Sequence, residues 1–207
     1  MMRKPTEIFC KWAEEGKDVG MEKGHATSVK DMLDFSIQER TDIGKNFSFL
    51  DLGCGNGWVA RKVAKNPLCT NAVGIDGAEQ MISNAIKNKG KVDYILADIN
   101  SYISPRRFDL IHSMEVLYYL EDPAKKVKNF NNDWLEDEGR LIIGIDHYYE
   151  NLDSHSWEEK VGTPMLMLKE AEWLDIFHES GLCDIKSWRS NQSKDWAGTL
   201  VLTGKKR

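Results

Sequence analysis

Short apolar segments alternate with segments of helical periodicity from residue 47 onward. Five apolar runs have the length and composition of buried strands, at 47–53, 71–76, 92–97, 108–113 and 141–145. Between them, apolar residues recur three or four positions apart, as on one face of a helix, at about 57–66, 81–86 and 120–134. This alternation predicts an α/β fold with a mainly parallel sheet and helices on both faces.

The end of the chain predicts one more helix and two more strands. Trp173, Leu174 and Phe177 mark the apolar face of a helix that ends near Gly181. Strands at about 182–188 and 197–203 follow and would bring the sheet to seven strands.

Two segments do not fit the alternation. In residues 1–46, Ser28 and Asp31 have the spacing of a weak capping box, and apolar residues follow at helical spacing. We interpret 1–46 as a helical cover and 47–207 as the main domain. Residues 147–167 are longer than an ordinary connection, and long loops in compact domains are often lids, so we predict a substrate lid there.

The sequence FLDLGCGNGW, from Phe49 to Trp58, indicates a cofactor-binding loop between a strand and a helix. Its glycines have the spacing G-x-G-x-G, and Trp58 occupies the position of the third glycine of a dinucleotide-binding loop. The run lacks the lysine of a phosphate-binding loop, and Asp51 would repel a pyrophosphate. These features favour a cofactor that carries an amino group and no phosphate.

Two further carboxylates end predicted strands. Asp76 lies 19 residues after Gly57, where a carboxylate can accept hydrogen bonds from both hydroxyls of a ribose. Asp98 follows the third strand. Each could instead cap a helix, starting at Gly77 or at about 100–103, and for Asp76 the two roles can coexist.

The glycine run resembles motif I of the class I S-adenosylmethionine-dependent methyltransferases, and residues 108–120 resemble the fourth motif of that family. The resemblance implies a Rossmann-like sheet with an antiparallel edge hairpin, S-adenosylmethionine as cofactor and S-adenosylhomocysteine as product. It places the ribose on Asp76, the adenine against Met81, and the adenine amino group on Asp98 beside the Ile99 amide. The predicted cofactor-binding residues are Asp51, Gly53, Cys54, Gly55, Asn56, Gly57, Asp76, Gly77, Met81, Asp98, Ile99 and Met114.

Composition limits the class of methyl acceptor and the cellular compartment that we expect. The formal net charge is −5, and an Asn-Pro-Pro-Tyr motif is absent, which disfavours nucleic acid as a partner. The four cysteines form no C-x-x-C pair, so we expect no metal site of zinc type and a reducing, cytoplasmic setting. We expect no signal peptide and no membrane span, because the N-terminus is polar and no apolar run approaches about 20 residues.

Methyl transfer from a sulfonium is a direct displacement, so the protein must mainly align the acceptor. A general base is needed only if the acceptor, an amine or a hydroxyl or carboxyl group, arrives protonated. We predict His147 as the proton acceptor, with Tyr119 and Glu115 as further catalytic candidates. Other candidates near the strand ends or in the unpatterned segments are His25, Tyr118, Asp146, Tyr148, Tyr149, His155 and Trp157.

Three alternatives to a small-molecule methyltransferase remain open. One is a methyltransferase-like subunit that holds the cofactor and acts through a protein partner. Another is an NAD-dependent oxidoreductase, against which Trp58 speaks. The third is an aminopropyl transferase, which would want several carboxylates around its acceptor channel. The sequence specifies neither the acceptor nor the oligomeric state.

Overall fold

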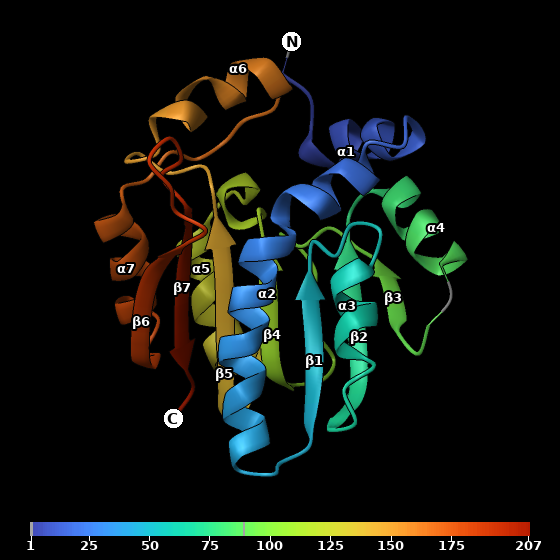
Figure 1. The fold of residues 1–207 in the computed structure, drawn as a ribbon, viewed down its shortest axis with the longest axis vertical. Coiled ribbons are helices and arrows are strands. Elements are labelled where there is room, and N and C mark those ends of the chain that lie inside the picture. Colours follow the sequence, from blue (N-terminus) through green and yellow to red (C-terminus); the bar gives the residue numbers. More distant parts are fainter. Residues whose placement is uncertain (1, 89) are drawn as a thin grey trace.

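The computed structural model describes residues 2–88 and 90–207, and a seven-stranded sheet of order β3-β2-β1-β4-β5-β7-β6 forms its centre (Figure 1). The strands are β1 (Phe47–Leu52), β2 (Cys69–Asp76), β3 (Asp93–Leu96), β4 (Phe108–Met114), β5 (Leu135–Ile145), β6 (Cys183–Ser190) and β7 (Thr199–Lys205). β1 to β5 run parallel, whereas β7 is antiparallel to both β5 and β6. The predicted α/β sheet with an antiparallel edge hairpin is confirmed.

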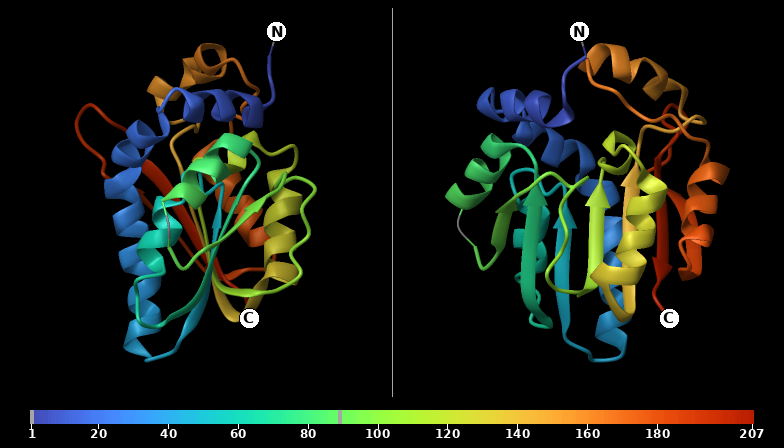
Figure 2. Two further views of the ribbon diagram at one scale, coloured as in Figure 1. Left: turned by 90° about the vertical axis from the view of Figure 1, so that its right-hand side faces the viewer. Right: turned by 180° about the vertical axis from the view of Figure 1, so that it is seen from behind.

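Each face of the sheet has its own apolar core. Successive strand residues point to opposite faces, so the neighbours Phe49 and Leu50 of β1 belong to two different clusters. Phe49 packs with residues of α2 (Asp18–Asp42) and α3 (Trp58–Val63). Leu50 shares its cluster with residues of α5 (Pro123–Asn129) and α7 (Glu170–Glu179), which cover the other face (Figure 2).

The carboxyl ends of the parallel strands lie beneath a cover made of the two segments outside the alternation (Figure 1). From one side come α1 (Pro5–Glu14), which packs on α4 (Glu79–Lys87), and the first turns of α2. From the other come η3 (Leu152–Ser156) and α6 (Trp157–Val161). The Arg3 amide donates to the Gly162 carbonyl (3.0 Å), and the Thr163 hydroxyl donates to the Arg3 carbonyl (2.9 Å), so the two parts of the cover meet.

Two predicted helices and one strand differ from the prediction, and the strand is β5, which begins at Leu135 instead of 141. Ser28 does not begin a helix, because α2 starts at Asp18 and Ser28 lies buried within it, hydrogen-bonded to Thr199 (2.7 Å). The helical stripe over 120–134 is divided. Asp122 caps the start of α5 by accepting from the Lys125 amide (2.9 Å), and a wider turn, η2 (Phe130–Trp134), replaces the last part of the predicted helix.

Candidate cofactor and acceptor site

A cavity of about 1230 Å³ lies between the carboxyl ends of the parallel strands and the cover. The glycine loop, the ends of β2 and β4, and helices α1, α2 and α6 all contribute residues to its wall. All of the predicted cofactor-binding residues except Gly57 line this cavity, as do Glu115 and Tyr119. Residues predicted from separate motifs therefore meet at one place.

The three glycines of the loop all have positive φ angles, of +68° at Gly53, +52° at Gly55 and +77° at Gly57. Such angles strain any residue with a Cβ. A Cβ on Gly53 would lie 2.2 Å from a methyl group of Val116, and one on Gly57 would lie 2.3 Å from the Tyr94 hydroxyl oxygen. At Gly55 the nearest atom would be the Met81 sulfur at 3.9 Å, so this glycine keeps its backbone open to the cavity.

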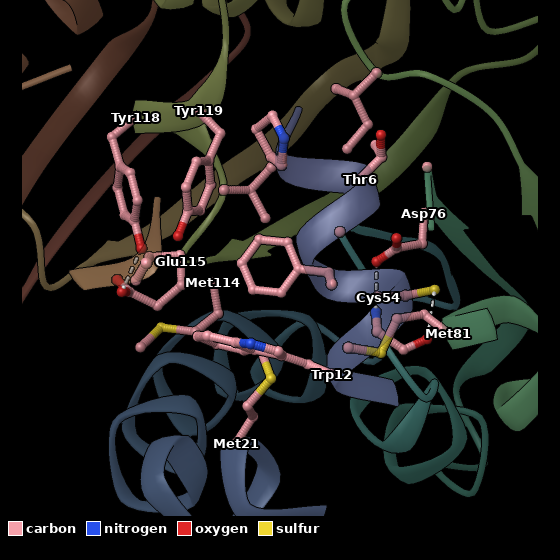
Figure 3. Close-up of a pocket in the computed structure, with 18 of the residues that line it drawn as sticks. Thr6, Trp12, Met21, Cys54, Asp76, Met81, Met114, Glu115, Tyr118 and Tyr119 are labelled. Atoms are coloured by element: carbon pink, nitrogen blue, oxygen red, sulfur yellow. Dashed lines mark hydrogen bonds between the residues drawn. The ribbon is translucent and has the colours of Figure 1, made fainter. Parts of the chain in front are cut away.

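Asp76 ties the glycine loop to the turn that follows β2 (Figure 3). One carboxylate oxygen accepts from the Gly55 amide (2.9 Å), and the other accepts from the Ala78 amide (2.8 Å). The hydrogen bond from the Ala78 amide holds the Asp76 side chain against the turn that precedes α4. Burial raises the pKa of Asp76 to about 6, against the effect of these two hydrogen bonds. A ribose contact remains a prediction.

Asp98 stands in a similar position after β3. Its Oδ1 accepts from the Asn100 amide (2.9 Å), and a turn rather than the short helix considered from sequence follows it. Asp98 and Ile99 line the cavity on the same side as Asp76.

Asp51 and His112 form a buried pair beneath the glycine loop, on the adjacent strands β1 and β4. Asp51 Oδ1 and His112 Nδ1 lie 2.8 Å apart, and the two residues are 2% and 0% exposed. Within residues 2–88 and 90–207, Asp51 Oδ2 and His112 Nε2 have no hydrogen-bond partner. Both residues line the cavity, although these two atoms are themselves buried. The sequence did not indicate His112 as a site residue, although it is the one histidine in the apolar run 108–113.

The first helix supplies a wall that no sequence motif indicated. Thr6 reaches Gly77 so closely that a Cβ there would lie 2.6 Å from the Thr6 methyl group. Figure 3 shows Trp12 between the Asp76 end of the cavity and the end formed by Glu115, with Met21 beside it. Amphipathic spacing in residues 1–46 could indicate a helix, but it could not show what the helix would cover.

The far end of the cavity is built around Glu115, which follows β4 with a φ of +61°. Its Oε2 accepts from the Tyr118 hydroxyl (2.7 Å), and its Oε1 accepts from the Asp146 amide. Burial, and next the charge of Asp146, raise the pKa of Glu115 well above its ordinary value. Burial also raises the pKa of Tyr119, whose ring lies 4.4 Å from that of Tyr118 between centroids.

His147 lies behind the cavity wall. It is 1% exposed, its Nδ1 lies 3.1 Å from the Ser154 carbonyl oxygen, and its ring stacks on Trp157 at 6.2 Å between centroids. Burial lowers the pKa of His147. Among the described residues it has no place in the cavity lining, so the geometry does not support our prediction of His147 as proton acceptor. Of the histidines predicted as candidates, His25 of α2 lines the cavity, and His112, which was not predicted, does so as well.

The remaining candidates also fall into residues that line the cavity and residues that do not. Tyr148 is buried and donates to the Gly198 carbonyl (2.9 Å), away from the cavity, whereas Tyr149 and His155 are exposed. Trp157 lines the cavity, and other residues of 147–167 that do so include Glu158, Val161 and Met165. The 147–167 segment thus forms part of the cavity wall, and its movement as a lid stays a prediction.

Comparison with known proteins agrees with this geometry. A family model described as a methyltransferase domain, Methyltransf_11, matches residues 50–152. A ubiquinone biosynthesis O-methyltransferase of Pelagibacter ubique is 27% identical over 169 residues, which are 72% of this chain and 67% of that protein. An (S)-coclaurine N-methyltransferase of Papaver somniferum is 28% identical over 171 residues, which are 76% of this chain. The chain spans about half the length of this plant relative, 48%.

Solved structures show the same fold along the chain. A Haloferax volcanii protein solved in complex with the Trm112 methyltransferase activator superposes with a TM-score of 0.81 at 23% identity, over 99% of both chains. The N-methyltransferase NodS of Bradyrhizobium japonicum, solved with S-adenosylhomocysteine, has a TM-score of 0.63 at 21% identity over 86% of this chain and 85% of that one.

The sheet, its antiparallel edge and the glycine loop at the carboxyl ends of its strands define a Rossmann-like protein of the methyltransferase class. The chain belongs to the class I S-adenosylmethionine-dependent methyltransferases, and residues 50–152 match the methyltransferase-domain model. The predicted family and S-adenosylmethionine as the cofactor are confirmed. In the described part of the chain, no helix has both the length and the apolarity needed to cross a bilayer.

Proposed function

We propose that this chain transfers the methyl group of S-adenosylmethionine to a small-molecule acceptor by direct displacement. One observation carries the proposal: the residues predicted to hold the cofactor and the Glu115–Tyr119 group line a single cavity. Its volume of about 1230 Å³ exceeds the range of roughly 300–1,000 Å³ typical of a site for one small ligand. A cofactor and an acceptor therefore fit side by side.

In this proposal the cofactor lies along the carboxyl ends of β1 to β3. Asp76 would accept from the ribose hydroxyls, and Asp98 and Ile99 would meet the adenine over Met81. Asp51 would place a negative charge near the amino group. The methyl group then points toward Met114, Glu115 and Tyr119. Holding the acceptor in line with the carbon–sulfur bond contributes about 7–11 kcal/mol to such reactions.

A small acceptor agrees with the closed cover and with the relatives. Both parts of the cover line the cavity and meet at Arg3 and Thr163, which favours an acceptor small enough to lie between them. The relatives named above are an O-methyltransferase of ubiquinone biosynthesis and an N-methyltransferase of coclaurine. The net charge of −5 also opposes binding of nucleic acid. All four cysteines are free, which fits a reducing compartment such as the cytoplasm.

The test is turnover by the purified chain. Pooled metabolites are incubated with S-adenosylmethionine, release of S-adenosylhomocysteine is measured, and the methylated product is identified by mass. We expect release with at least one pool, and loss of release in the Asp76→Ala variant. Tight binding of S-adenosylhomocysteine without release from any pool would contradict the proposal.

A second candidate is a methyltransferase subunit that needs a protein partner. It is favoured by the match to the Haloferax volcanii protein, which was solved with an activator and covers 99% of this chain. The two candidates differ in one measurement. A chain of the second kind gives no turnover alone and gains turnover when an activator of the Trm112 type is added.

A further inference from the structure

Three ionisable side chains from distant parts of the sequence meet beside the acceptor end of the cavity. His25 comes from α2, Glu115 follows β4, and Asp146 follows β5. One ligand atom from each lies within 4.8 Å of those of the other two. His25 and Glu115 line the cavity, and Asp146 stands behind them with 6% of its surface exposed.

This cluster holds two buried carboxylates without a strong cation. In the described part of the chain, Asp146 has one ion-pair partner, His25, with Nε2 and Oδ2 4.0 Å apart, and Glu115 has none. Burial lowers the pKa of His25, which disfavours a charged imidazole beside these carboxylates. A buried carboxylate without a counter-charge is costly.

A second observation points to a missing donor. Asp146 Oδ1 is buried and has no hydrogen-bond partner among residues 2–88 and 90–207. The Thr199 hydroxyl lies beside Asp146 and also shares a hydrogen bond with Ser28 (2.7 Å). Polar atoms so deeply buried normally have a partner, and their exceptions call for an explanation such as a bound group.

We propose that His25, Glu115 and Asp146 bind the protonated amino group of the methyl acceptor, which makes the substrate an aliphatic amine. The inference rests on the proposed methyl transfer and names the substrate class of that site. An ammonium nitrogen offers three donors to these oxygen and nitrogen acceptors. The Trp12 and Tyr119 rings on the cavity wall can contact the alkyl part and attract the charge.

The spacing of the cluster suits an ammonium group better than a metal ion. A nitrogen at hydrogen-bond length, about 2.9 Å, from both His25 Nε2 and Asp146 Oδ2 sits between them at nearly a right angle when they are 4.0 Å apart. A metal ion at about 2.1 Å from both would require a ligand–metal–ligand angle of about 145°, which lies between the angles of a tetrahedral and an octahedral site.

The chemical step balances within this arrangement. The ammonium group first gives one proton to the cluster, which frees the nitrogen lone pair. The lone pair forms a bond to the methyl carbon, the carbon–sulfur bond breaks, and its electron pair stays on sulfur. The positive charge passes from sulfur to nitrogen, so the products are the methylated ammonium ion and neutral S-adenosylhomocysteine.

The experiment compares amines with alcohols of the same carbon skeleton. Calorimetric titration at neutral pH, with the protein saturated by S-adenosylhomocysteine, uses propylamine, cyclohexylamine and phenethylamine, each beside its alcohol. We expect at least one amine to bind about tenfold or more tightly than its alcohol, as a charge-assisted hydrogen bond allows. Glu115→Gln and Asp146→Asn should reduce this preference to about twofold or less. Asp175→Asn, an exposed carboxylate of α7, should leave it unchanged.

The outcomes separate this inference from the proposed function. Binding of S-adenosylhomocysteine by each variant shows that it is folded, and the wild-type comparison stands even if a variant is not. Equal binding of every amine and its alcohol overturns the inference, as does tight Mn²⁺ or Zn²⁺ binding that competes with the amines. Failure of the wild type to bind S-adenosylhomocysteine overturns the proposed function instead.

Discussion

Asp76 holds the glycine loop in place and also lines the cavity. Its two oxygens accept from the amides of Gly55 and Ala78, and the same side chain lines the cavity. Because burial raises its pKa to about 6, the charge of this residue changes close to neutral pH. Cofactor affinity should therefore depend on pH in a way that an exposed aspartate would not produce.

We predict that affinity for S-adenosylhomocysteine is full above about pH 6 and falls as pH decreases through that value. The ionised carboxylate accepts charge-assisted hydrogen bonds, and protonation removes them. Asp76→Asn should bind about tenfold or more weakly at neutral pH and lose this pH dependence. Calorimetry across the pH range measures both effects. An equal pH slope in Asp76→Asn would assign the titration to another group.

The glycines of the loop should differ in their tolerance of a Cβ. We predict that Gly57→Ala destabilises the protein by about 3 kcal/mol, because a left-handed backbone angle and a clash with Tyr94 add together. Gly55→Ala has the backbone strain without the clash and should cost about 1 kcal/mol. Urea denaturation measures both. Truncation of Tyr94 to alanine in the Gly57→Ala background should recover part of the loss, and no recovery would contradict the clash.

At the scale of elements, the sequence pattern located the strands well and the helix boundaries less well. The apolar run 108–113 became β4 (Phe108–Met114), because a run buried on both faces is hard to mistake for a surface segment. Ser28 was wrong as a helix start, because its hydroxyl is used in a tertiary contact with Thr199 rather than at a cap. Local capping signals cannot reveal such a contact.

The α1 helix should contribute to ligand binding more than to folding. We predict that Trp12→Ala lowers affinity for S-adenosylhomocysteine about tenfold with little change in Tm, because Trp12 lines the cavity and belongs to neither large core. Trp188 of β6 is the matched control. It packs on Phe35 at 5.0 Å between centroids, outside the cavity, so Trp188→Ala should lower Tm and keep the affinity. The reverse pattern would contradict the assignment.

Arg140 joins four elements through its guanidinium group. It is 1% exposed in β5 and donates to Glu39 of α2 (2.9 Å), Asp184 of β6 (2.7 Å) and Thr203 of β7 (3.0 Å). Burial opposes ionisation of Glu39, but the hydrogen bonds from Arg140 and Lys205 leave its pKa lowered. Hydrogen bonding to Arg140 likewise lowers the pKa of Asp184.

We predict that Arg140→Met destabilises the protein at neutral pH by on the order of 2 kcal/mol, because both carboxylates lose their partner and both are partly exposed. Since their folded pKa values are depressed, this stabilisation is present above the ordinary pKa values and is lost as pH falls through the folded ones. Urea denaturation of both proteins at neutral and acidic pH tests this, and a constant difference would contradict it.

At the scale of the whole molecule, the two segments outside the alternation act as one cover. They meet where Arg3 bonds to Gly162 and Thr163, and both line the cavity. We predict that S-adenosylhomocysteine slows hydrogen exchange in residues 3–25 and 147–167 as well as in the glycine loop, because opening of the cover would release the ligand. Amides in the middle of β1 and β4 serve as the control. Protection confined to the glycine loop would contradict a closing cover.

The sequence by itself determined the alternating elements, the class of cofactor and most of the residues around the glycine loop that line the cavity. These follow from local rules: the alternation of apolar residues, the need for glycine at positive φ, and acidic residues at strand ends. Only the tertiary structure decided which of the predicted histidines lines the cavity. His147 and His25 were both candidates, and their placement depends on how α2 and the segment after β5 pack over the sheet. The same is true of the His25–Glu115–Asp146 cluster, because its members are joined by topology and not by proximity along the chain.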